Sequence, residues 1–163
     1  MVTSQSGPAQ KVRDVVSPVV SAAGLFLEDV EVARSGRRHV VRVVVDLDED
    51  AVGSLGSDAL ADVSRDVSAA LDRHDPVQGE YVLEVSTPGT SRPLTELRHF
   101  RRARTRLVRL ALRDGRTVSG RLVDAGPDGL RLEGDSGPVD VALDDVARGT
   151  VELDFRSTED EEA

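Results

Sequence analysis

The spacing of apolar residues in the first half of the chain alternates between helical and strand patterns. Residues 9–23 carry valines three and four positions apart, which predicts a helix that ends before Gly24. Residues 25–34 and 39–47 are rich in valine and flank a turn at residues 35–38, which predicts an antiparallel hairpin. Ser57 is expected to be the N-cap of a second helix that runs to about Arg73.

A break at Asp75-Pro76 and a strand at residues 81–85 complete this half of the chain. The order helix, strand, strand, helix, strand predicts a small α/β layer. Both of its helices are expected on one face of a three-stranded sheet.

The second half of the chain changes to short strands. After a short helix near residues 94–103, apolar runs separated by turn residues predict five strands, at residues 106–112, 117–123, 130–132, 139–143 and 151–153. Asp114-Gly115 is a strong hairpin signal. Five short strands in about fifty residues predict a small closed or nearly closed β-barrel.

These elements give an α+β class and a division into domains. We expect an N-terminal α/β domain at residues 9–91, a linker with a short helix at 92–104, and a β-barrel at 105–157. Residues 1–8 and the acidic tail 158–163 are expected to be disordered. The start of the chain shows no signal peptide pattern, and no apolar run is long enough to span a bilayer, so we expect no membrane partner.

Charge is distributed unevenly along the chain. The formal net charge is -9, yet residues 92–121 hold ten of the twenty arginines and only two acids, Glu96 and Asp114. Such a cluster suits phosphate or carboxylate recognition, because the guanidinium group forms two parallel hydrogen bonds with either. The predicted partner-binding residues are Arg92, Arg98, Arg101, Arg102, Arg104, Arg109 and Arg121. Structural ion pairs with neighbouring acids are the alternative use of these side chains.

Catalytic and metal-binding patterns are weak. Asp46, Asp48 and Asp50 alternate as in a calcium loop, but Ala51 stands where glycine is required and Ser57 where the bidentate acid belongs, so we expect a solvated acidic loop. The three histidines are scattered outside any metal-ligand spacing and the chain has no cysteine, so we expect no metal site. Three phenylalanines and one tyrosine are too few for stacking of unpaired bases.

A turn rich in Pro, Gly, Ser and Thr separates the two halves of the chain. It lacks the second glycine and the lysine of a phosphate loop, and no histidine and acid are placed to activate its hydroxyl groups. We expect a rigid interdomain elbow in which prolines fix φ and glycine allows a left-handed conformation. Its residues are Ser86, Thr87, Pro88, Gly89 and Pro93.

Three segments resemble the bacterial ribosome maturation factor RimP family: residues 62–72 (DVSRDVSAALD), residues 81–89 (YVLEVSTPG) and Arg92-Pro93-Leu94. The similarity extends over nearly the whole folded chain. The resemblance implies a cytoplasmic, non-enzymatic assembly factor that needs no metal or cofactor, with an N-terminal α/β domain and a C-terminal Sm-like or SH3-like barrel. We expect the protein to be a monomer. It also implies binding to the free small ribosomal subunit through rRNA and a basic ribosomal protein near the decoding region. A stand-alone Sm-type RNA-binding protein is the alternative, which the N-terminal domain and the scarce aromatic residues disfavour.

Overall fold

The computed structural model describes residues 7–89 and 91–152, which form two compact units. The first unit contains the described residues up to Asp48 together with Ser54–Pro88. The second contains Glu49–Gly53 and the described residues from Gly89 onward. The chain therefore passes between the units at three points, and Glu49–Gly53 is a short segment of the second unit enclosed in sequence by the first.

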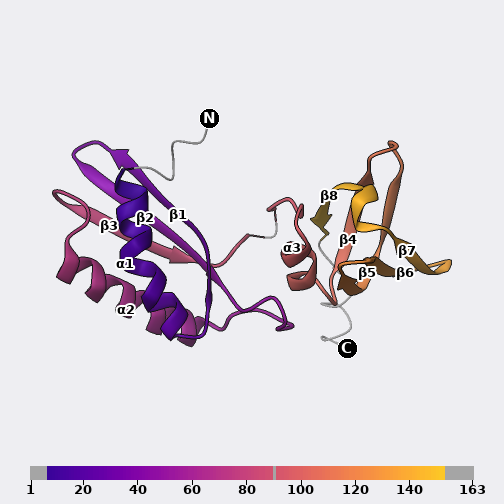
Figure 1. Ribbon diagram of the computed structural model, residues 1–163, viewed down its shortest axis with the longest axis horizontal. Helices are drawn as coiled ribbons and strands as arrows, with labels where there is room; N and C mark the ends of the chain where they lie inside the picture. Colours follow the sequence, from indigo (N-terminus) through magenta and orange to yellow (C-terminus); the bar gives the residue numbers. More distant parts are fainter. Residues whose placement is uncertain (1–6, 90, 153–163) are drawn as a thin grey trace, which may run out of the picture. The chain divides into compact units, whose positions relative to one another are not determined.

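The first unit contains two helices and a three-stranded sheet, as the sequence predicts (Figure 1). Its elements are α1 (Pro8–Ala22), β1 (Phe26–Ser35), β2 (Arg38–Asp46), α2 (Ser57–His74) and β3 (Tyr81–Ser86). Strand β1 pairs with β2 antiparallel, and β2 pairs with β3 parallel, because α2 carries the chain back before β3 begins. The N-cap of α2 is Gly56, so the prediction that Ser57 fills that position is wrong by one residue.

One valine-rich core holds the first unit together. The periodic valines of α1, among them Val12 and Val16, are fully buried against Val41 and Val43 of β2 and Val67 of α2. Both helices therefore cover the same face of the sheet, since residues 41, 43 and 45 point to one side of β2. The opposite face carries exposed charges. There Arg42 of β2 forms ion pairs with Glu31 of β1, at 3.3 Å, and with Glu84 of β3, at 3.5 Å.

The second unit is a five-stranded antiparallel sheet with one short helix. Its elements are α3 (Leu97–Arg102), β4 (Leu107–Leu112), β5 (Thr117–Gly126), β6 (Gly129–Gly134), β7 (Gly137–Val141), the 3-10 turn η1 (Leu143–Asp145) and β8 (Val146–Val151). The strand order is β7-β6-β5-β4-β8, so the sheet is open between β7 and β8 in the described residues. The predicted closed or nearly closed barrel is not confirmed. The predicted last strand, at 151–153, begins five residues earlier than expected, and its final residue lies outside the described part of the chain.

Phe100 of α3 is the largest side chain in the core of the second unit. It is fully buried beside Leu110 of β4 and Gly149 of β8, in a core that takes side chains from all five strands. Gly149 lies so close to the Phe100 ring that an added Cβ would stand 2.9 Å from its Cε1 atom. The same core includes Leu94, whose backbone exchanges hydrogen bonds with Gly149 at 2.7 and 2.8 Å. These contacts fix α3 and the residues before it against the sheet.

None of the helices in the described residues is both long and apolar enough to cross a membrane. The predicted disordered segments, 1–8 and 158–163, lie mainly outside the described residues. Pro8, at the edge of the first of them, is already the first residue of α1.

Candidate functional site

The predicted arginines all belong to the second unit, and most of them surround α3. Arg98, Arg101 and Arg102 are on the helix, while Arg92 precedes it and Arg104 follows it. The helix begins with a capping box in which Glu96 accepts from the backbone of His99 and the His99 ring accepts from the backbone N–H of Glu96. Because Phe100 is buried in the sheet core, the neighbouring arginines are held at the edge of that core.

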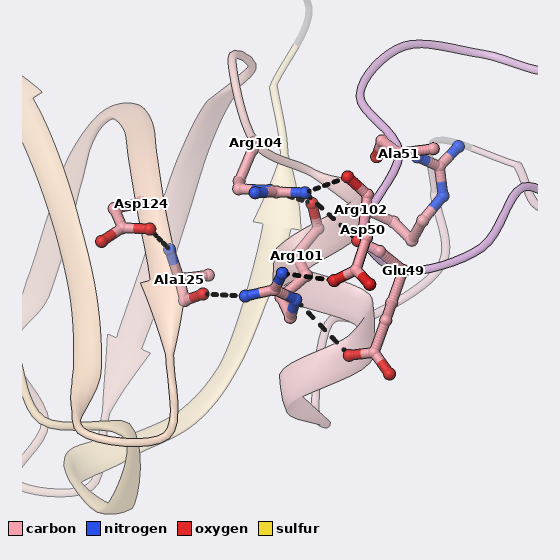
Figure 2. Close-up of polar contacts among 8 residues, drawn as sticks. All are labelled: Glu49, Asp50, Ala51, Arg101, Arg102, Arg104, Asp124 and Ala125. Atoms are coloured by element: carbon pink, nitrogen blue, oxygen red, sulfur yellow. Dashed lines mark hydrogen bonds and ion pairs between the residues drawn. The ribbon is translucent and has the colours of Figure 1, made fainter.

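Three of these arginines bind the Glu49–Gly53 segment (Figure 2). Arg101 donates from Nη2 to the Asp50 carboxylate at 2.6 Å, and its Nε lies 3.4 Å from a Glu49 carboxylate oxygen. Arg102 donates to the backbone carbonyls of Ala51 at 2.6 Å and Gly53 at 2.8 Å. We call this set of contacts the arginine clamp.

Arg104 completes the arginine clamp. Its Nη2 donates to the backbone carbonyls of Glu49 and Asp50, at 3.2 and 3.0 Å, and its Nε donates to the carbonyl of Arg101 at 2.8 Å. Arg101 also donates to the carbonyl of Ala125 in β5 at 2.8 Å, which ties the clamp to the sheet. The clamp arginines therefore donate more hydrogen bonds to backbone carbonyls than to carboxylates.

The clamp changes the interpretation of both charged segments. Asp50 is exposed, at 76% of its side chain, as expected for a solvated acidic loop, but the loop is anchored by three guanidinium groups. Glu49 and Asp50 also offset two of the three positive charges. The acidic run between β2 and α2 and the basic run around α3 are thus partners of each other. The sequence allows structural ion pairs for these arginines, but it does not identify Glu49–Gly53 as their partner.

The remaining predicted arginines also have partners within the protein. Arg109 of β4 pairs with Glu152 at 2.9 Å and is 61% exposed. Arg121 of β5 donates to the carbonyl of Thr105 at 2.6 Å. Arg92 and Arg98 are half-buried and have interactions within the chain as well. Of the seven predicted arginines, Arg109 is the one whose side chain is mainly open to solvent.

The predicted elbow is placed where the chain passes from the first unit to the second. Ser86 is the last residue of β3, Thr87 and Pro88 complete the first unit, and Gly89 begins the second. The φ angle of Gly89 lies outside the left-handed region, so the left-handed conformation that glycine allows is not used here. Its carbonyl accepts from the Arg92 amide at 3.2 Å. Pro93 is exposed beside the buried Leu94. The rigidity of this elbow stays a prediction.

An open pocket of about 430 Å³ lies in the first unit between α2 and the start of β3. Its lining includes Arg38, Asp72, Glu80 and Tyr81. Burial and a 2.7 Å hydrogen bond to Asp72 raise the pKa of Tyr81 to about 12, so its hydroxyl group is a donor at neutral pH. No group of three or more acidic or histidine side chains within residues 7–89 and 91–152 is arranged to hold a metal ion.

Comparison with known proteins connects this architecture to one family. The family model described as the RimP N-terminal domain matches residues 15–91. The chain is 44% identical over 168 aligned positions to the ribosome maturation factor RimP of Kineococcus radiotolerans, an alignment that covers 90% of this chain and 80% of that protein. It is 39% identical over 183 aligned positions to the ribosome maturation factor RimP of Parafrankia sp. (strain EAN1pec). That alignment covers 92% of this chain and 58% of the longer protein.

Proposed function

Because the chain belongs to the ribosome maturation factor RimP family, we propose that it is a ribosome maturation factor that binds the free small ribosomal subunit and assists its late assembly. The observation that carries this proposal is the match to two proteins of that name over 90% or more of the chain. The match extends across both units, so it supports a common role for the whole described chain and not for the first unit alone.

The proposed partners are small-subunit rRNA and a basic ribosomal protein near the decoding region. A net charge of -9 favours a basic protein partner and opposes long-range attraction to RNA. Contact with rRNA therefore has to be local and made through grouped arginines. Such contacts would place the protein on phosphates without reading a base sequence, in keeping with the few aromatic side chains.

The second unit is proposed to be the Sm-like barrel of this family. In support of this, the sheet follows chain order from β4 to β7 and then adds β8 beside β4. Register shifts between Leu122 and Asp124 in β5, and between Val146 and Arg148 in β8 where it pairs with β4, are bulges of the kind that bend strands. Side chains from all five strands also share one core, as a strongly curved sheet requires. The 92–104 linker and the rigid elbow remain part of this proposal.

The mechanism we infer is non-enzymatic. The protein assists assembly by binding one local arrangement of rRNA and ribosomal protein more tightly than its alternatives, which shifts the population of subunits toward that arrangement. It acts in the cytoplasm as a monomer and needs no cofactor. Joining of the large subunit would weaken binding and release the factor.

Co-sedimentation tests this function directly. The purified protein is mixed with separated small subunits, large subunits and joined ribosomes, at low and at near-physiological salt. Selective sedimentation with free small subunits at both salts is the expected result. Equal binding to all three particles that disappears as salt rises would reduce the interaction to non-specific phosphate attraction and refute the proposal. Native mass measurement checks the monomer.

A further inference from the structure

The hairpin of β1 and β2 contains the longest stretch of the first unit that has arginines but no acidic residue. Residues 32–45 contain four arginines and no acidic residue. Arg42 is neutralised by Glu31 and Glu84 on the open face of the sheet. The other three arginines, Arg34, Arg37 and Arg38, lie at or beside the turn and are exposed.

No carboxylate in the described residues forms an ion pair with the three arginines of this turn. Arg34 donates from Nε to the Gly36 carbonyl at 3.5 Å, which is a weak contact within the turn itself. Arg37 and Arg38 have no hydrogen bond or ion pair to their side chains anywhere in residues 7–89 and 91–152. These side chains differ in this respect from the arginine clamp, whose donors are used by Glu49–Gly53.

Backbone pairing holds the turn in a defined shape. The antiparallel register continues to the pairs Arg34 with His39 and Ser35 with Arg38, so the strands stay paired up to the turn. Gly36 has a φ of 64°, a left-handed conformation that glycine adopts without steric cost, which permits so tight a connection. The three arginines are therefore presented by a short, ordered ribbon at the end of the sheet where α1 begins (Figure 1).

We propose that the β1–β2 turn, through Arg34, Arg37 and Arg38, is a contact surface for rRNA phosphate groups. This inference rests on the proposed function and assigns its rRNA contact to the first unit. Arg37 and Arg38 lose no internal hydrogen bond when they bind phosphate, and Arg34 loses only its weak contact with the Gly36 carbonyl. Phosphate contacts by exposed arginines also release counterions, which gives the interaction its salt dependence.

Two nearby carboxylates determine how the phosphates can approach. Asp72 and Glu80 line the open pocket beside Arg38, and Asp72 already accepts the hydroxyl hydrogen bond of Tyr81. Their negative charge disfavours a phosphate inside the pocket. The proposed contact is therefore on the turn itself, with the backbone of an RNA strand, and the pocket is left empty of phosphate.

The test compares two triple variants with the same loss of charge. R34Q/R37Q/R38Q removes the turn arginines, while R113Q/R116Q/R148Q removes three exposed arginines of the second unit and serves as the matched control. Affinity for purified free small subunits is measured from 50 to 200 mM salt. Removal of three phosphate contacts should flatten the slope of log K against log salt by about 2 to 3, since each contact contributes about 0.7 to 0.9.

This slope predicts a clear difference in salt sensitivity. Over the fourfold rise in salt, the wild-type affinity should fall about 20- to 40-fold more than the affinity of the turn variant. The control variant should keep the wild-type slope. R34K/R37K/R38K, which keeps the charges, should also keep that slope, and unchanged melting temperatures for all variants would show that they are folded.

The outcomes separate the two proposals. If the wild-type protein does not bind free small subunits, the proposed function is wrong. If it binds and the turn variant matches it in affinity and slope, the function stands and the assignment of the turn is overturned. A turn variant that binds subunits weakly with an unchanged salt slope would indicate an acidic protein surface as the partner, and this result also overturns the phosphate assignment.

Discussion

Substitution of Arg102 with glutamine should weaken the attachment of the Glu49–Gly53 segment to α3. Arg102 is half-buried and donates to the carbonyls of Ala51 and Gly53. Glutamine is shorter and uncharged, so it can replace at most one of these hydrogen bonds, and only as a neutral donor. The anchored segment should therefore open more often, while the sheet core around Phe100 is untouched.

The magnitude follows from the two bonds, at 2.6 and 2.8 Å. A hydrogen bond from a charged donor contributes about 1.5–3 kcal/mol. Both carbonyls regain water when the segment opens, so we take this range for the pair and not for each bond. A loss of about 1.5–3 kcal/mol raises the open population about 10- to 150-fold, at about 1.4 kcal/mol per factor of ten.

Limited proteolysis measures that population. A glutamate-specific endoproteinase can cut after Glu49 only when the segment leaves α3, and under conditions of fast reclosing the cleavage rate follows the open population. Mass spectrometry locates the cut. The control is R148Q, which makes the same charge change at an exposed position of β8. A cleavage rate for R102Q within about twofold of the R148Q rate would refute the reasoning that the two carbonyl contacts hold the segment.

G149A, with G126A as its control, tests the core of the second unit, and D72N tests the one tyrosine. G149A should destabilise the second unit by about 1–3 kcal/mol in thermal unfolding, because the new Cβ would stand 2.9 Å from the buried Phe100 ring and 3.0 Å from Leu110. G126A, which meets nothing within 4 Å, should have an effect near zero. In a phenolate absorbance titration, Tyr81 should ionise near pH 12, and D72N should lower this pKa toward 10 without reaching it, because burial, the largest cause of the shift, remains. Because the folded-state pKa is raised, the stability linked to Tyr81 is present below pH 10 and is lost between pH 10 and 12, a loss that D72N should reduce.

Local sequence patterns predicted the first unit well because its elements are periodic. The valines of α1 repeat at helical spacing and lie at the core, and the turn at 35–38 joins two paired strands. The pairing of β3 with β2 in parallel could not be derived from one strand of six residues. The last strand was misplaced because η1 and β8 follow each other without a turn residue such as glycine or proline to mark the boundary.

The candidate site was less predictable, because charge along a sequence does not reveal which charges meet. Residues 92–121 were singled out by their density of arginine, yet Arg101, Arg102 and Arg104 are used to bind a segment about fifty positions earlier. That contact could not be found from spacing, since most of its acceptors are backbone carbonyls, which every residue carries. In the less dense group, Arg37 and Arg38 have no internal acceptor in the described residues, and Arg34 has only the weak contact with the Gly36 carbonyl.

A fall in subunit affinity has a different meaning when the clamp arginines are replaced than when the turn arginines are replaced. Replacement of the clamp arginines changes the anchoring of Glu49–Gly53 as well as the surface charge, so a fall in subunit affinity would not by itself identify a phosphate contact. Replacement of the turn arginines changes surface charge with little change in internal bonding, so a fall in affinity with a flatter salt slope has one physical cause. A second unit prepared alone from Gly89 would also lack Glu49–Gly53 and would expose the clamp arginines to phosphate. RNA binding by such a fragment would therefore overstate the part that α3 plays in the whole chain.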